Sequence, residues 1–169
     1  MAPSPAPAST PVVAAEPPPG FVELPALGLG GFDALARPWF LRDEDGSLVG
    51  GFRVMPHMAN PNGVCHGGML ATFCDVHMSV ATVYLHAELA PRLLPTVSLS
   101  LDYLQPIPLG AWVEGRAQLL RAGRRLAFIQ DLLTVDGVPA VRASGTFSVP
   151  SADTGGDEMR RRLRGLLGT

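Results

Sequence analysis

The sequence predicts an α+β fold in which one long buried helix is wrapped by an antiparallel sheet of five or six strands. The helix is expected over residues 67–85, because this segment is apolar nearly all round and carries one charged side chain, Asp75. Four strand segments follow it, at residues 96–104, 111–121, 125–135 and 138–149. Short turns at Ala122-Gly123 and Asp136-Gly137 join the last three, and turns this short connect antiparallel neighbours.

Length and composition predict one globular domain. A chain of 169 residues with 47% hydrophobic content can bury a substantial core. The net charge of −2 gives no reason to expect nucleic acid as a partner. The chain shows no secretion signal, and Asp75 interrupts its long apolar segment, so we expect no membrane span and a cytoplasmic location. Cys65 and Cys74 are too few for a disulfide scaffold, which fits that compartment.

The domain is expected at residues 21–150, with a tail on either side. Residues 1–20 hold seven prolines and five alanines, which predicts a disordered segment with little to bury. Residues 151–169 predict a second tail that ends in a basic, frayed helix exposed to solvent. Binding of that basic end to an acidic surface is the alternative.

The N-terminal half of the domain is less regular. A short helix is expected over residues 32–36, with Phe32 and Leu35 packed onto the domain. The segments 39–41 and 48–55 flank a run of turn residues and predict a hairpin. After the long helix, residues 96–104 alternate strictly, and one face carries the apolar members Val97, Leu99, Leu101 and Tyr103.

The candidate functional site is the stretch from Asn60 to Leu85. Glycines at the start of a helix let a ligand approach the free N–H groups of the first turn, where the helix dipole favours negative charge. Two turns later, Asp75 stands alone in an uncharged segment, where a carboxylate is costly unless it is paired. An oxyanion-binding turn and an isolated acid together predict a site for chemistry.

The motif in this stretch is Asn60-x-x-Gly63-x-x-His66-Gly67-Gly68, with Asp75 eight residues after Gly67. It is followed by the strand from Thr96, a break at Pro106 and a second strand with Gly110-Ala-Trp-Val-Glu-Gly. This pattern resembles the hotdog-fold acyl-coenzyme A thioesterases of the phenylacetate-pathway type, over residues 39–149. The resemblance implies a hotdog fold, hydrolysis of acyl-coenzyme A and a homo-oligomer.

The resemblance also implies roles for individual residues. Asp75 would be the general base or the nucleophile, and the Gly67 N–H would polarise the thioester carbonyl. Asn60 would position the attacking water or the carboxylate, His66 would support the loop, and Thr96 would orient the water. We expect further substrate contacts from four residues: Gly68, Thr72, Arg121 and Arg124. No metal and no organic cofactor are expected.

The same residues also allow structural roles or a different chemistry. Asp75 could be a structural acid bonded to Thr72 or Ser79, its neighbours on the helix face. Cys65 beside His66 could suggest a thiol nucleophile, but adjacent residues rarely face each other. The four histidines lack the spacing of a helical zinc site. The arginines at the turn near residue 123 could meet coenzyme A phosphates or could form a solvated hairpin tip.

Two other functions remain possible for such a chain. The pocket could bind acyl-coenzyme A without catalysis, although an intact Asp75 argues against this. A hotdog hydratase or dehydratase is the third possibility.

Helix geometry predicts a shared site. Asp75 lies about 12 Å along the axis from Gly67, since eight residues rise about 1.5 Å each. One carbonyl cannot touch both, so we expect Gly67 and Asn60 of one subunit to face Asp75 and Thr96 of another in a two-fold homodimer. A dimer of dimers is the expected assembly.

Overall fold

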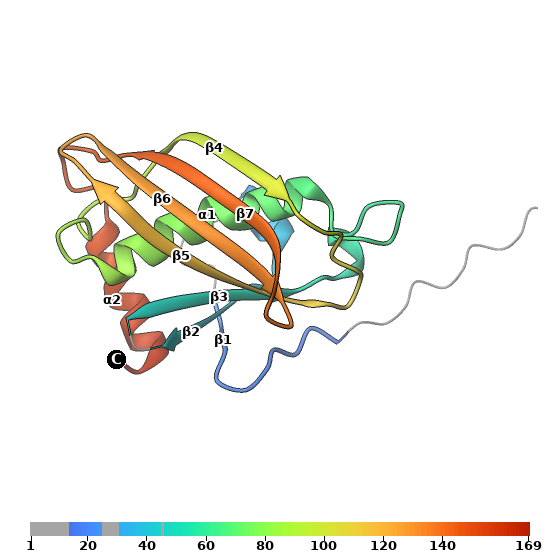
Figure 1. Cartoon of the computed structure of the whole chain (residues 1–169). Coiled ribbons are helices and arrows are strands. Elements are labelled where there is room, and N and C mark those ends of the chain that lie inside the picture. The colour runs from blue at the N-terminus through green and yellow to red at the C-terminus, as the bar shows by residue number, and fades with distance from the viewer. Residues whose placement is uncertain (1–13, 25–30, 45) are drawn as a thin grey trace, which may run out of the picture.

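The computed structural model describes residues 14–24, 31–44 and 46–169. Most of the expected N-terminal tail therefore lies outside the described residues. Seven strands form one antiparallel sheet in the order β1-β2-β3-β5-β6-β7-β4, and the long helix α1 packs across one face (Figure 1). The strands are β1 (Val22–Glu23), β2 (Phe40–Glu44), β3 (Ser47–Arg53), β4 (Thr96–Tyr103), β5 (Trp112–Ala122), β6 (Leu126–Val135) and β7 (Val138–Ser148). The helices are η1 (Phe32–Ala36), η2 (Pro56–Met58), α1 (Gly67–Leu85) and α2 (Gly156–Leu167).

The architecture confirms the predicted fold class, with one strand more than expected. The additional strand is β1, whose two residues are too few to show any periodicity. Helix α1 has the predicted bounds, and eleven of its residues are buried. Helix α1 is long and apolar enough to cross a membrane by length and composition alone, even with Asp75 in it. In this structure it is the core helix, and the sheet surrounds it.

The short helix η1 forms at the expected residues, but its two large apolar side chains are exposed to solvent. Phe32 and Leu35 are 68% and 73% exposed, whereas Ala36 is buried. The expectation that the two large side chains pack onto the domain was wrong. A helix this short has no second turn that would fix which face turns inward, so composition alone could not orient it.

The C-terminal segment differs from the expected solvated tail. Residues 156–167 form helix α2, which contacts α1 and buries Met159 and Leu163. Gly156 lies directly against the backbone, since a Cβ there would come within 2.1 Å of the Ala90 carbonyl oxygen. The four-residue spacing of Met159 and Leu163 is the sequence signal for this packed face.

A buried ion pair holds α1 to the sheet. His77 of α1 donates from Nδ1 to Asp131 of β6 over 2.7 Å and from Nε2 to the Leu48 carbonyl of β3 over 3.1 Å. Two donating nitrogens require the doubly protonated ring. Burial lowers the pKa of His77, but the charge and hydrogen bond of Asp131 and the Leu48 carbonyl outweigh this and raise the pKa above its ordinary value. In the sequence, the traces of this pair are a histidine in an apolar helix and an aspartate on the apolar face of an alternating strand.

Two glycines make room for the His77 ring. A Cβ at Gly50 of β3 would lie 2.6 Å from His77 Cδ2, and one at Gly115 of β5 would lie 3.1 Å from Nδ1. Phe73 stacks on the same ring, with 5.3 Å between the centroids. The sheet therefore carries a recess that fits this one part of the helix.

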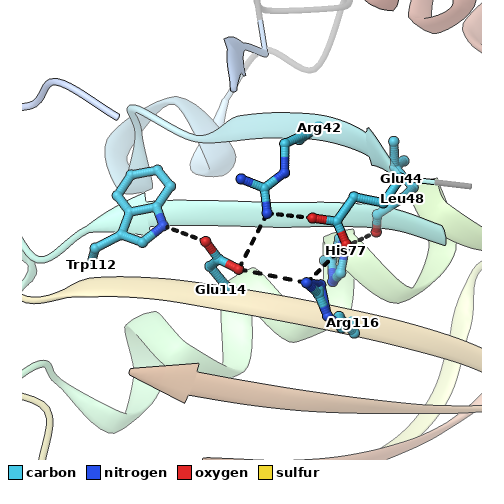
Figure 2. Close-up of polar contacts among 7 residues, drawn as sticks. All are labelled: Arg42, Glu44, Leu48, His77, Trp112, Glu114 and Arg116. Atoms are coloured by element: carbon cyan, nitrogen blue, oxygen red, sulfur yellow. Dashed lines mark hydrogen bonds and ion pairs between the residues drawn. The ribbon is translucent and has the colours of Figure 1, made fainter. Parts of the chain in front are cut away.

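The opposite face of the sheet carries a network of charged side chains from β2 and β5 (Figure 2). Arg42 and Arg116 each contact both Glu44 and Glu114, and Trp112 donates to Glu114 over 3.2 Å. These side chains link β2 to β5 across β3 on the outer face, while His77 approaches the sheet from the α1 side.

Candidate active site

The start of α1 leaves one backbone donor free. His66 is the N-cap: its Nδ1 accepts from the Gly68 N–H over 2.9 Å, and its carbonyl accepts from the N–H groups of Met69 and Leu70. Among the hydrogen bonds of the described residues, none uses the Gly67 N–H. Because Nδ1 accepts, the ring proton of His66 is on Nε2. Gly67 therefore carries a backbone N–H at the start of α1 that has no hydrogen-bond partner among the described residues.

The Gly68 N–H is already hydrogen-bonded and is not free to donate to a ligand. This N–H is taken by His66, and the Gly68 carbonyl accepts from Thr72 Oγ1 over 2.8 Å. Thr72 therefore bonds to its own helix and not to Asp75.

The loop before α1 is held by Asn60. Its side-chain oxygen accepts from the N–H groups of Asn62 and Val64, over 2.9 and 3.4 Å. Gly63 has a φ of 74°, which a side chain would strain, and allows the turn. The side-chain amide of Asn60 remains as a donor, because its oxygen is occupied within the loop.

Tyr103 of β4 adjoins Gly67, although no motif in the sequence marks it. Its hydroxyl donates to the Gly67 carbonyl over 2.9 Å, and a Cβ on Gly67 would lie 3.2 Å from the ring. Tyr103 is 54% exposed, whereas its alternation placed it with the apolar face of the strand. Its ring forms one wall beside the free N–H, and glycine at position 67 leaves space for it.

Asp75 lies further along α1, in contact with the start of β4. Thr96 Oγ1 donates to Asp75 Oδ1 over 2.5 Å, so the carboxylate is bonded to neither Thr72 nor Ser79. Asp75 is half-buried, not buried as a lone acid in a core helix would be. The reason is that Asp75 faces an open pocket of about 310 Å³, which Thr96 also lines.

The first turns of α1 and the segment around Asp75 border different pockets of the chain. A second pocket, of about 320 Å³, lies beside the α1 N-terminus and is lined by His66, Gly68, Thr72 and the exposed side chains of η1. Helix η1 contributes Phe32 and Leu35 to this pocket and Asp33 to the Asp75 pocket. Asp33, like Tyr103, could not be found from the sequence, since nothing in its local pattern marks it.

The arginine cluster lies away from Gly67. Arg121 and Arg124 are exposed at the β5–β6 turn, at the end of the sheet where β4 begins (Figure 1). The strand register places the β5–β6 turn at the same end of the sheet as Thr96, because Thr96 pairs with Phe147 and Phe147 pairs with Ala127, just after the turn. The arginines are thus on the side of Thr96.

The cysteines do not support a thiol nucleophile. Burial raises the pKa of Cys65 to about 12 and also raises that of Cys74 well above its ordinary value. A thiol in such surroundings stays protonated near neutral pH.

Residues 62–134 match the family model described as the thioesterase superfamily. A Pseudomonas aeruginosa protein, PA0474, whose name describes an esterase, is 32% identical over 117 residues, which cover 69% of this chain and 86% of that protein. The acyl-coenzyme A thioesterase THEM4 of Xenopus laevis is 34% identical over 74 residues, which cover 44% of this chain and 31% of that protein.

Solved structures agree with this family. Zebrafish thioesterase superfamily member 2 superposes with a TM-score of 0.66 at 26% identity, covering 74% of this chain and 91% of that one. A Streptococcus pneumoniae thioesterase protein solved with coenzyme A gives 0.62 at 22% identity, covering 70% and 93%. The phenylacetic acid degradation protein PaaI of Thermus thermophilus gives 0.58 at 24% identity, covering 70% and 96%. The chain therefore belongs to the thioesterase superfamily and has its hotdog fold.

Proposed function

We propose that the protein hydrolyses acyl-coenzyme A thioesters to the free acid and coenzyme A, at sites that two subunits of a homodimer share. The observation that carries the proposal is the free Gly67 N–H at the start of α1. The acyl-coenzyme A thioesterase among the relatives and the coenzyme A bound to a related structure support the choice of substrate.

In this mechanism, the Gly67 N–H donates to the thioester carbonyl oxygen and stabilises the charge that develops there. A donor placed in this way contributes about 10²–10³ in rate. Asp75 acts as general base toward water or attacks the carbonyl itself. Thr96 holds Asp75 Oδ1, which leaves Oδ2 for the reaction. When water attacks, the tetrahedral intermediate expels coenzyme A as the thiol, which takes the proton that Asp75 removed from the water. When Asp75 attacks, the expelled thiolate leaves an acyl anhydride on Asp75, and water then hydrolyses this anhydride to the free acid, releases Asp75 and supplies the proton of the thiol.

The other residues support this arrangement. The Asn60 amide orients the water or the carboxylate, and His66 keeps the first turn of α1 in shape through the Gly68 N–H. Gly68 and Thr72 border the substrate, Gly68 by its small size and not as a donor. Arg121 and Arg124 would meet the phosphates of coenzyme A.

Two observations support a dimer: the separation of Gly67 and Asp75 along α1, and the exposed edge of the sheet. Strand β4 forms that edge, and its side chains Val97 and Tyr103 are 61% and 54% exposed. An unpaired edge strand with apolar side chains favours pairing with another chain. A two-fold axis beside β4 would bring the Gly67 of one subunit toward the Asp75 of its partner. A further pairing into a dimer of dimers stays a prediction.

The mechanism is tested with Asp75→Asn, and Asp136→Asn is the control with the same change of charge on the β6–β7 turn. Thiol release from acyl-coenzyme A should fall by about 10³ or more in Asp75→Asn, by analogy with the loss of other catalytic groups, while substrate binding and folding persist. The control should keep full activity. If Asp75→Asn retained most of the activity, the proposed mechanism would be wrong. If the wild-type protein bound acyl-coenzyme A without releasing thiol, it would be a binding protein.

The shared site is tested by mixing two inactive variants, Asp75→Ala and Asn60→Ala, under conditions that exchange subunits. In a mixed dimer, one site carries both lesions and the other carries neither, so about half the activity of a wild-type dimer should return. Exchange without recovery would mean that each chain holds a complete site.

A further inference from the structure

The pocket that holds Asp75 contains a second carboxylate. Helix η1 contributes Asp33 to its lining, and α1 contributes Asp75. The other described lining residues are hydroxyl-bearing or apolar, among them Val76, Val80 and Leu93. No arginine or histidine of the described residues lines this pocket.

Neither carboxylate is neutralised by a cation among the described residues. Asp75 accepts a hydrogen bond from the Thr96 hydroxyl, which carries no charge. The ion pairs of the described residues include neither Asp33 nor Asp75. The pocket therefore presents negative potential on apolar walls, and low-dielectric walls strengthen such a field.

This charge determines which part of a substrate can enter. The phosphates of coenzyme A need cations, and this pocket has none among its described lining residues, whereas an apolar acyl group fits its walls. An acyl group that ends in a second carboxylate would meet both Asp33 and Asp75, and like charges brought together oppose binding.

We propose that Asp33 is a specificity-determining residue, which restricts the site to thioesters of uncharged acyl groups and rejects those of dicarboxylic acids. This inference rests on the proposed function, because it assigns the Asp75 pocket to the acyl group. Asp33 acts by repulsion of the wrong substrate and takes no part in the reaction.

The test compares two acyl groups of equal carbon number, butyryl and succinyl, which differ in ending with a methyl group or a carboxylate. Thiol release gives kcat/KM for both coenzyme A thioesters on the wild-type protein, Asp33→Asn and the control Asp136→Asn. The ratio of the two kcat/KM values cancels any general effect of charge on coenzyme A. We expect Asp33→Asn to lower the preference for butyryl by roughly tenfold, as removal of one nearby like charge implies. The change should come from faster use of succinyl-coenzyme A.

The outcomes separate the two proposals. Butyryl hydrolysis with an unchanged preference in Asp33→Asn would overturn the role of Asp33 and leave the thioesterase function intact. If neither thioester were hydrolysed, the proposed function would fail. The affinities of the same two compounds, measured by calorimetry on the same three proteins, would then decide whether Asp33 discriminates between them. An equal shift in Asp136→Asn would show an effect of net charge and would also contradict the inference.

Discussion

Replacement of Asp131 by alanine should destabilise the protein strongly. Asp131 is 1% exposed, and its carboxylate faces the protonated His77 ring, which is 3% exposed. Without the carboxylate, a buried imidazolium would have no counter-charge, and removal of one partner of a buried pair costs about 3–5 kcal/mol. For a chain of this size each kcal/mol corresponds to about 2–4 °C, so the melting temperature should fall by roughly 6–20 °C.

The same pair predicts how stability depends on pH. The folded pKa of His77 is raised above its unfolded value, so the folded state binds the additional proton. The contribution of the pair is therefore fully present below the unfolded pKa of about 6.5 and is lost as pH rises through the folded pKa. Urea unfolding at several pH values above 6 should show this decline in the wild-type protein and not in Asp131→Ala.

Two results would refute this reasoning. One is a loss in Asp131→Ala of less than about 0.5 kcal/mol, which is the range of ordinary surface substitutions. The other is the same pH dependence in both proteins. The double variant His77→Leu/Asp131→Ala should recover part of the loss, because an apolar replacement removes both charges.

Substitutions at Gly50, Gly156 and His66 test the packing and capping of the helices. Gly50→Ala should cost about 1–3 kcal/mol in urea unfolding, because its Cβ would lie 2.6 Å from the His77 ring, whereas Gly165→Ala, with nothing within 4 Å, should be neutral or slightly stabilising. Gly156→Ala should detach α2, because its Cβ would come within 2.1 Å of a backbone oxygen; limited proteolysis should then remove the C-terminal segment, and unchanged resistance would contradict this packing. His66→Ala should cost about 1 kcal/mol as a lost helix cap, and His66→Asn should restore most of it if capping is the cause.

Local patterns were sufficient to predict most of the fold. The bounds of α1 followed from its apolar run after paired glycines, and the hairpin at Asp136-Gly137 followed from turn chemistry, with φ values of 50° and 78°. These features depend on neighbours in the sequence. The short strand β1 and the outward face of η1 depend on tertiary contacts, which no local pattern reports.

The site could be predicted only in part, for the same reason. Gly67, Asp75 and Thr96 were predicted as site residues from a family resemblance, and the structure brings Thr96 and Asp75 into hydrogen-bond contact. Tyr103 reaches Gly67 from 36 residues away, and Asp131 reaches His77 from 54 residues away. Asp33 enters the Asp75 pocket through a helix whose orientation the sequence leaves open. Each of these residues acquires its role from the closure of the sheet around α1.

The recess for His77 also bears on how the chain selects one fold. Helix α1 is apolar on nearly every side, so hydrophobic contact alone would accept several rotations of the helix against the sheet. A step of one residue along a helix turns the surface by about 100°, and a slip of one turn moves it about 5.4 Å. Either change would move His77 away from Asp131 and from the space that Gly50 and Gly115 leave. Both charges would then be buried in an apolar interior without a partner. We infer that this pair makes the alternative packings of α1 unfavourable, and so determines which face of the helix, Asp75 included, is presented to the pocket.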